Sequence, residues 1–273
     1  MSHNEAETLA RELLSAYETD QIVPLLPSAR PGFDLNMAYE VEATLKRFRE
    51  LGGHRAVGRK VGYANKAMWR VLKLETLVWA HMYDDTVHQT DSNSATLALA
   101  HSRSLKIEPE IVFGLKQPII AEGLDAAAAL ESAEWLAMGF EIIDCPFPEW
   151  KFQPGDFVAS FGLHAALVVG QRMPVQQESV PTLVDELSRF KVRMSRNGAF
   201  VEEGSGRNAL KNPASCLAEL SAAISRRFSD EPLSAGEIVS SGTLTAGHAT
   251  GAGDEWTVDV EGIPLPSLSL RLT

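Results

Sequence analysis

The spacing of apolar residues changes along this chain of 273 residues, and the change limits the folds open to it. Residues 4–19 and 34–51 carry apolar side chains three and four positions apart, the period of a helix with one buried face. Residues 255–263 and 265–272 alternate between apolar and polar side chains, as half-buried antiparallel strands do. Helices first and mostly strands afterwards predict an α+β fold and argue against a repeated strand–helix–strand sheet.

Shorter segments fill in the middle of the chain. Glycine-bounded residues 56–63 and apolar residues 105–115 read as strands, and Asn197-Gly198 is a strong hairpin signal. The remaining expectations are a helix at 125–139, a strand at 140–144, a longer strand region at 156–171 and a helix at 212–228. We therefore divide the chain into a largely helical N-terminal region, 1–80, and a β-rich portion, 81–273, that carries the site.

Composition excludes some classes of partner. The formal net charge of −11 argues against nucleic acid, because binding phosphate needs a basic surface. No apolar run approaches the roughly 20 residues needed to span a bilayer, so we expect no membrane association. The first residues resemble an amphipathic helix, and not a signal peptide. Two cysteines, Cys145 and Cys216, fit a cytoplasmic protein in which both are packing residues.

Two glutamates flank a proline in the strand at 105–115. Side chains two apart on a strand point to the same side, so Glu108 and Glu110 face one way and repel unless a cation or proton lies between them. Pro109 cannot donate a ladder hydrogen bond, which predicts a sheet edge or a bend. A solvated edge strand is the simpler interpretation. Glu141 favours a metal site instead, because a glutamate inside the apolar segment GFEIID needs a partner in order to be buried. Three carboxylates suit Mg²⁺ or Mn²⁺.

Five ordered segments carry a family resemblance: GRKVG, KIEPEIVF, GFEIID, GSGRNALKNPASCLAEL and EIVSSGTLTAG. Together they resemble the 2-keto-4-pentenoate hydratase family, within the fumarylacetoacetate hydrolase-like superfamily. The resemblance runs from near Pro24 almost to the C-terminus. It implies a fumarylacetoacetate hydrolase-like fold for the β-rich portion, metal ligation by Glu108, Glu110 and Glu141, and a homo-oligomer.

The same resemblance implies roles for four further positions. Lys60 would face the carboxylate or keto oxygen of the substrate. A surface lysine is the commonest alternative, but the place of Lys60 in an apolar, glycine-bounded strand favours a functional role. Asp85, with Asp84 as the alternative register, matches a catalytic aspartate of the family, and either residue would serve equally to cap a turn. Thr243 and Thr245 match a hydroxyl-rich turn that helps to hold the substrate carboxylate.

One segment departs from the family pattern. In Ser160–His164, Phe161 stands where an asparagine is usual and His164 where a serine is usual. Both positions belong to the substrate-facing wall in the family, so we take Phe161 and His164 as candidate substrate contacts. For His164, an acid/base or carboxylate contact and a satisfied core histidine are equally open.

The resemblance implies a reaction class. A 2-keto acid chelates a metal, which stabilises the enolate formed when a proton leaves the adjacent carbon. The expected reaction is hydration of a 2-hydroxy-2,4-dienoate to a 4-hydroxy-2-oxoacid, as in the meta-cleavage catabolism of aromatics. Decarboxylation of a 2-oxo-dicarboxylate and hydrolysis of an acylpyruvate are the alternatives with the same site. A non-catalytic partner or ligand-binding subunit is the alternative from another class, which Phe161 motivates.

Overall fold

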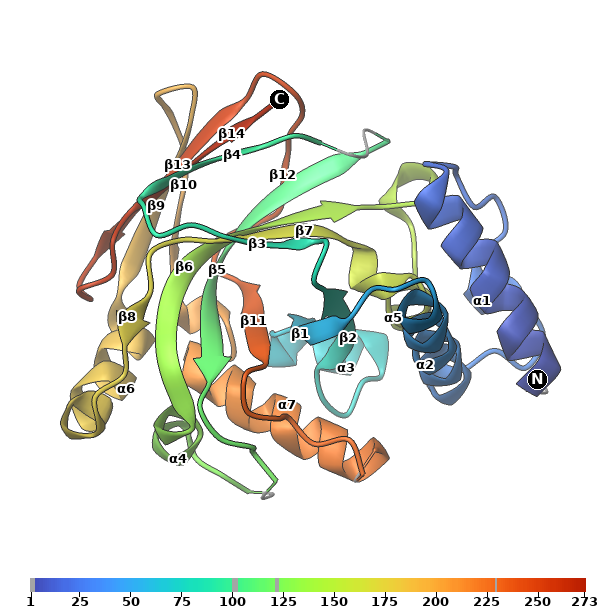
Figure 1. Cartoon of the computed structure of the whole chain (residues 1–273), viewed down its shortest axis with the longest axis horizontal. Helices are drawn as coiled ribbons and strands as arrows, with labels where there is room; N and C mark the ends of the chain where they lie inside the picture. The colour runs from blue at the N-terminus through green and yellow to red at the C-terminus, as the bar shows by residue number, and fades with distance from the viewer. Residues whose placement is uncertain (1–2, 100–102, 121–122, 229) are drawn as a thin grey trace.

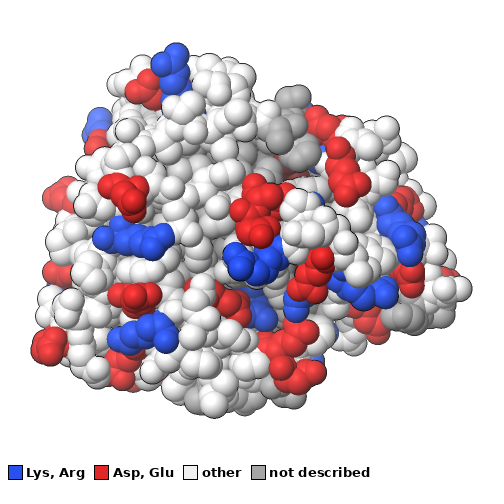
Figure 2. Space-filling view, in the orientation of Figure 1, with Lys and Arg blue, Asp and Glu red and all other residues white. Residues whose placement is uncertain are grey.

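The structure is a computed structural model that describes residues 3–99, 103–120, 123–228 and 230–273. Within these residues it contains two sheets and seven α-helices, which confirms the predicted α+β class. None of the described helices is long and apolar enough to cross a membrane. On the face seen in Figure 2, acidic and basic side chains are interspersed and form no continuous basic patch.

The larger sheet builds the centre of the molecule. Nine described strands form it, seven of them in the order β2-β1-β11-β5-β6-β7-β3, with β12 paired to β5 and β8 to β6. Their bounds are β1 Ala56–Gly62, β2 Val78–Tyr83, β3 Val87–Gln89, β5 Leu105–Leu115, β6 Ala133–Asp144, β7 His164–Val169, β8 Met173–Pro174, β11 Ile238–Thr243 and β12 His248–Ala249.

The smaller sheet contains five described strands in the order β10-β9-β13-β14-β4. Their bounds are β4 Ser94–Leu97, β9 Lys191–Arg196, β10 Ala199–Ser205, β13 Glu255–Glu261 and β14 Leu268–Leu272. Asn197 and Gly198 connect β9 to β10 with positive φ angles, as a tight hairpin requires. The predicted hairpin and the two predicted C-terminal strands are therefore confirmed.

Helices surround the larger sheet. Their bounds are α1 His3–Glu18, α2 Leu35–Leu51, α3 Lys66–Leu72, α4 Ala126–Glu131, α5 Pro154–Ala159, α6 Val180–Arg189 and α7 Pro213–Arg227. The Asp34 side chain caps α2 by accepting from the Met37 N–H at 2.9 Å. In Figure 1, α1 and α2 lie at the right, α7 along the lower side and the smaller sheet at the upper left. Contacts of α7 with β11 and β2 bury its apolar face.

Two sequence predictions need correction. The helix predicted at 125–139 ends at Glu131, and residues 133–144 form one long strand, β6. Nearly every residue of β6 is buried, so no alternation marks it as a strand. The strand region predicted at 156–171 begins instead with α5 and a 3₁₀ turn, Phe161–Leu163, and only 164–169 is strand.

The division proposed at residue 80 falls inside β2. β1 and β2 belong to the same sheet as β5 and β6, and β1 pairs in parallel with β11. Residues on both sides of the division therefore reach the site. The division into two parts stays a prediction.

Candidate metal and 2-keto acid site

Three glutamates meet on the two central strands of the larger sheet. Glu108 and Glu110 lie on β5, and Glu141 on β6 stands directly opposite Glu108 in the antiparallel register. Their carboxylate oxygens approach within 4.8 Å of one another. Glu110 and Glu141 are fully buried and Glu108 is partly buried. The predicted convergence of the three carboxylates is therefore present.

Pro109 was predicted to lie at a sheet edge or a bend, and the sheet edge is wrong. β5 is an internal strand between β11 and β6. β11 ends at Thr243, which stands opposite Glu110, so Pro109 lies just past the last residue of β5 that β11 pairs. Its carbonyl accepts from the Leu244 N–H at 2.9 Å. The missing N–H of Pro109 is tolerated there because β11 is no longer regularly paired.

Each buried carboxylate has its own polar partners. Glu110 Oε2 accepts from Ser240 Oγ at 2.5 Å and from the Gly242 N–H at 2.8 Å. Glu141 Oε1 lies 2.9 Å from His164 Nδ1, and the other ring nitrogen of His164 lies 3.0 Å from Thr86 Oγ1. His164 thus orients Glu141 from behind, with both of its nitrogens occupied by protein groups.

Lys60 reaches the same carboxylates from β1. Its Nζ lies 2.8 Å from Glu141 Oε2, and its side chain is 2% exposed. This buried ion pair helps to hold the pKa of Glu141 below its ordinary value. Lys60 is therefore buried in the site, and the alternative of a surface lysine is wrong.

Burial and mutual repulsion perturb the three carboxyl groups. Burial raises the pKa of Glu108 to about 7, with Glu141 adding to the rise and Lys60 opposing it. Burial, then Glu141 and Glu108, raise the pKa of Glu110 well above its ordinary value. For Glu141, burial also acts upward, but Lys60 and His164 together hold its pKa below its ordinary value. The cluster therefore disfavours three negative charges without an added cation.

These features fit a divalent cation. Glu108, Glu110 and Glu141 supply the oxygen donors that Mg²⁺ and Mn²⁺ prefer. Glu141 is fully buried, and a cation held there would share its carboxylate with Lys60, whose Nζ lies 2.8 Å from Oε2. A cation would also offset the burial and relieve the mutual repulsion that together raise the pKa values of Glu108 and Glu110.

A cavity of about 480 Å³ opens beside the carboxylates. Lys60, Glu108, Glu110, Thr243 and Thr245 all line it. The other lining residues are Val61, Gly62, Tyr63, Ala64, Asn65, Lys106, Ile143, Trp150, Phe152, Phe157, Leu163, Asn208, Gly242 and Gly247. The lining therefore combines charged side chains with aromatic and apolar ones, which suits a small unsaturated acid.

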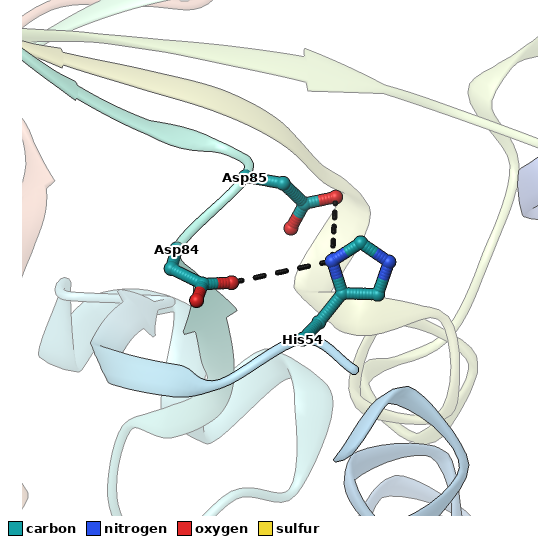
Figure 3. Close-up of side chains that lie close together, drawn as sticks. All are labelled: His54, Asp84 and Asp85. Carbon is teal, nitrogen blue, oxygen red and sulfur yellow. Dashed lines mark ion pairs between the residues drawn. The ribbon is translucent and has the colours of Figure 1, made fainter. Parts of the chain in front are cut away.

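Asp85 lies away from this cavity, at the turn after β2. Arg49 Nη2 contacts both Asp85 oxygens at 2.6 Å, and His54 Nδ1 lies 3.3 Å from Asp85 Oδ2. Figure 3 shows His54 directed at Asp85 and Asp84. Asp84 ties this turn to the segment before β1 by accepting from the Arg55 N–H at 3.0 Å. Neither aspartate lines the cavity, so the structure does not bring the predicted catalytic aspartate to the glutamates.

Phe161 is also separate from the cavity. Its ring packs on Tyr17 at 4.6 Å and on Tyr83 at 6.2 Å between centroids. His164, three residues later, acts behind Glu141 and does not line the cavity. The change of sequence in Ser160–His164 therefore alters the support of the carboxylates more than the surface that faces a ligand.

Sequence reasoning missed several residues that line the cavity or hold a carboxylate. Ser240 belongs to SSGTLTAG and holds Glu110, and Tyr63 directly follows the GRKVG strand. Asn208 lies in GSGRNALKNP, where its amide donates to the Leu244 carbonyl at 2.7 Å. Their place in motifs already singled out was the available signal. Lys106 precedes Glu108 by two positions, and the strand period alone places it on the same side.

Comparison with known proteins places this site in a family. The family model "Fumarylacetoacetate (FAA) hydrolase C-terminal" matches residues 63–268. The chain belongs to the fumarylacetoacetate hydrolase family. This confirms the resemblance drawn from the motifs, and the match spans the strands that carry all three glutamates.

Individual relatives cover nearly the whole chain. The 2-hydroxyhexa-2,4-dienoate hydratase of Comamonas testosteroni is 27% identical over 94% of this chain and 94% of its own. The 4-oxalocrotonate decarboxylase of Pseudomonas sp. strain CF600 is 27% identical over 96% of both chains. The solved 4-oxalocrotonate decarboxylase of Pseudomonas putida G7, complexed with magnesium and adipate, superposes with a TM-score of 0.88 at 25% identity, covering 100% of this chain and 99% of that one.

Proposed function

We propose that this protein is a divalent-metal-dependent hydro-lyase that hydrates a 2-hydroxy-2,4-dienoate to a 4-hydroxy-2-oxoacid. The observation that carries the proposal is the meeting of Glu108, Glu110 and Glu141 beside a cavity that also exposes Lys60. Hydratases of this substrate class at 24–27% identity over nearly the full chain support it. We place the reaction in the cytoplasm and expect the enzyme to be a homo-oligomer, as the family resemblance implies.

The proposed roles follow from the contacts. Glu108, Glu110 and Glu141 would hold Mg²⁺ or Mn²⁺, which supplies Lewis acidity to the keto oxygen and carboxylate of the substrate. Lys60 adds a fixed positive charge at Glu141 and orients the anionic end of the substrate. His164 keeps Glu141 in position.

The cavity walls would hold the rest of the substrate. The rings of Phe152 and Phe157 line the cavity and exclude water from the diene. Thr243 and Thr245 lie at its edge, where the Thr243 hydroxyl donates to the Thr245 carbonyl at 3.0 Å and holds the turn in place. Contact of these two threonines with the substrate carboxylate stays a prediction.

Proton transfer is assigned to groups within the cavity. The Asp85 carboxylate is held by Arg49 and His54 outside the lining, so water beside Lys60 is the better candidate for moving the proton. We therefore expect Asp85→Asn to change neither kcat nor Mg²⁺ affinity appreciably. A lower kcat with unchanged Mg²⁺ affinity would show instead that Asp85 acts as the family's aspartate.

Decarboxylation is the second candidate, and the solved decarboxylase with a TM-score of 0.88 favours it. Acylpyruvate hydrolysis has less support, because none of the described residues lining the cavity is a histidine that would pair with a carboxylate to activate water. The argument for a non-catalytic subunit was that Phe161 changes the substrate-facing wall. Phe161 instead packs on Tyr17 and Tyr83 and leaves the cavity open, so this argument no longer holds.

Product analysis tests the proposal. Purified protein with Mg²⁺ is given 2-hydroxypenta-2,4-dienoate, a 2-oxo-3-enedioate or an acylpyruvate, and products are followed by NMR and by released carbon dioxide. We expect 4-hydroxy-2-oxopentanoate from the dienoate, its loss in Glu141→Ala, and its retention in Glu134→Ala, an exposed glutamate on the same strand. Carbon dioxide from the enedioate without hydration of the dienoate would establish the decarboxylase instead.

A further inference from the structure

Glu108 is held differently from the other two glutamates of the site. Glu110 accepts hydrogen bonds from Ser240 and from a backbone N–H, and Glu141 contacts His164. Glu108 accepts no hydrogen bond from any residue that the structure describes, and only burial and nearby charges act on the pKa of its carboxyl group. A carboxylate that binds a metal needs a fixed orientation, so another group must restrain Glu108.

The backbone at Gly247 lies directly against this carboxylate. A Cβ at Gly247 would lie 2.9 Å from Glu108 Oε1 and 3.5 Å from Glu108 Cδ, so only glycine fits without a shift of the carboxylate. Both residues line the cavity. Gly247 therefore bounds one side of the Glu108 carboxylate and limits the rotamers that are open to it.

Glu202, on β10 of the smaller sheet, joins the two residues that flank Gly247. Its Oε2 accepts from the Ala246 N–H at 3.1 Å and lies 2.7 Å from His248 Nε2. One carboxylate oxygen thus contacts both the residue before the glycine and the residue after it. The position of Gly247 therefore depends on the Glu202 side chain.

Other contacts fix the same segment, residues 244–248. The Leu244 N–H donates to the Pro109 carbonyl of β5 at 2.9 Å, and the Asn208 amide donates to the Leu244 carbonyl at 2.7 Å. On β10, Gly204 lies so close to the Leu244 carbonyl oxygen that a Cβ there would overlap it. The segment is therefore held between β5 of the larger sheet and β10 of the smaller one.

We propose that Glu202 is a positioning residue that fixes the Glu108 carboxylate through the backbone of Gly247. The inference rests on the proposed function, because it takes Glu108 as a metal ligand. Glu202 does not line the cavity, so its effect on a bound cation passes through the glycine and not through direct contact. The smaller sheet, which supplies none of the three glutamates, thereby sets part of the metal affinity.

Calorimetry with Mg²⁺ on two Glu202 variants tests the inference. Glu202→Ala removes both contacts, and we expect Mg²⁺ to bind about tenfold more weakly, as when a group that orients a metal ligand is lost. Glu202→Gln should keep the wild-type Kd, because both contacts reach one oxygen and the amide oxygen of glutamine accepts the same two donors. At saturating Mg²⁺, kcat of Glu202→Ala should return to the wild-type value, which a general distortion of the site would not allow.

A glycine variant and two controls probe the same contact independently. Gly247→Ala places a Cβ against Glu108 and should also weaken Mg²⁺ binding, whereas Gly251→Ala adds a Cβ in open space and should not. Glu203→Ala removes the next glutamate of β10, whose side chain is 62% exposed and points to the other face of the strand. It should leave the Kd for Mg²⁺ unchanged.

Each unfavourable result has a distinct meaning. An unchanged Kd in Glu202→Ala overturns the inference and leaves the proposed function standing. Equal weakening in Glu202→Ala and Glu202→Gln also overturns it, because Glu202 would then act through its charge. A low kcat of Glu202→Ala at saturating Mg²⁺ overturns it as well. If Glu202→Ala does not fold, His248→Ala, which removes one of the two contacts, replaces it with the same expected direction. Wild-type protein that binds no Mg²⁺ overturns the proposed function itself.

Discussion

Lys60 Nζ lies 2.8 Å from Glu141 Oε2, and both side chains are almost completely buried, at 2% and 0% exposed. They come from strands that are three positions apart in the sheet, with β11 and β5 between them. The pair joins the predicted substrate-facing lysine to the predicted metal ligands. It also makes Glu141 the residue through which His164, Lys60 and a cation would influence one another.

Removing the lysine should destabilise the metal-free protein. Lys60→Met leaves the buried Glu141 charge without its cation, and we expect the free energy of unfolding to fall by about 3 kcal/mol. Lys46→Met, which breaks the more exposed pair with Glu231, should cost no more than about 1 kcal/mol. Urea unfolding without metal measures both. Equal losses in the two variants would show that the buried Lys60–Glu141 pair contributes no more to the free energy of unfolding than an exposed pair does.

His164 should affect metal affinity more than the chemical step. His164→Ala leaves Glu141 Oε1 without its partner, and we expect Mg²⁺ to bind roughly 10- to 100-fold more weakly. His164→Gln retains a donor and should recover part of that loss. His88→Ala, an exposed histidine on β3, serves as the control. A kcat that stays low at saturating Mg²⁺ would argue instead that His164 acts in the reaction itself.

Gly162 is required by both its backbone conformation and its neighbours. Its φ is +60°, and a Cβ there would lie 3.0 Å from Lys60 Cδ and from Ala80 Cβ. Gly162→Ala and Gly198→Ala should each lose about 1 kcal/mol of stability, because both positions have positive φ. Only Gly162→Ala should also lower activity, by displacing Lys60. Activity equal to that of Gly198→Ala would contradict this coupling.

Glu42 gives the stability a pH dependence. Burial acts to raise its pKa, but His81 outweighs burial through its charge and through ring and backbone N–H groups at 2.7 and 2.9 Å, so the pKa of Glu42 lies below its ordinary value of 4.5. The stability from the charged form is then fully present above pH 4.5 and is lost as the pH falls through the lower folded value. Glu42→Gln should therefore cost more stability at pH 7 than at pH 3, by urea unfolding. A cost independent of pH would contradict the assignment.

The local period of the sequence was enough to predict part of the site. Side chains alternate on a strand, so Glu108 and Glu110 had to share a side. Glu141 needed a partner because its neighbours are apolar. The fumarylacetoacetate hydrolase family followed from ordered motifs and was confirmed. The inferences about the glutamates succeeded because each depends on neighbours within a few residues, and the family inference succeeded because five motifs occur in the family's order.

Inferences that depend on tertiary contacts failed or stayed open. The alanine-rich start of 125–139 is helical, as α4, but residues 133–139 belong to β6, where pairing with β5 overrides the helix propensity. His164 was open between a ligand contact and a core histidine until its partners, Glu141 and Thr86, were known. Asp85 matched a motif, yet Arg49 and His54 hold it elsewhere.

Calorimetric titration with Mg²⁺ and Mn²⁺ is the most direct test of the central claim that the three glutamates bind a divalent cation. Wild-type protein should release or absorb binding heat with a stoichiometry of about one ion per chain, as a single carboxylate cluster requires. The Glu108→Ala/Glu110→Ala variant should show none. Heat from wild type no greater than that from the variant would contradict the metal site and, with it, the proposed chemistry.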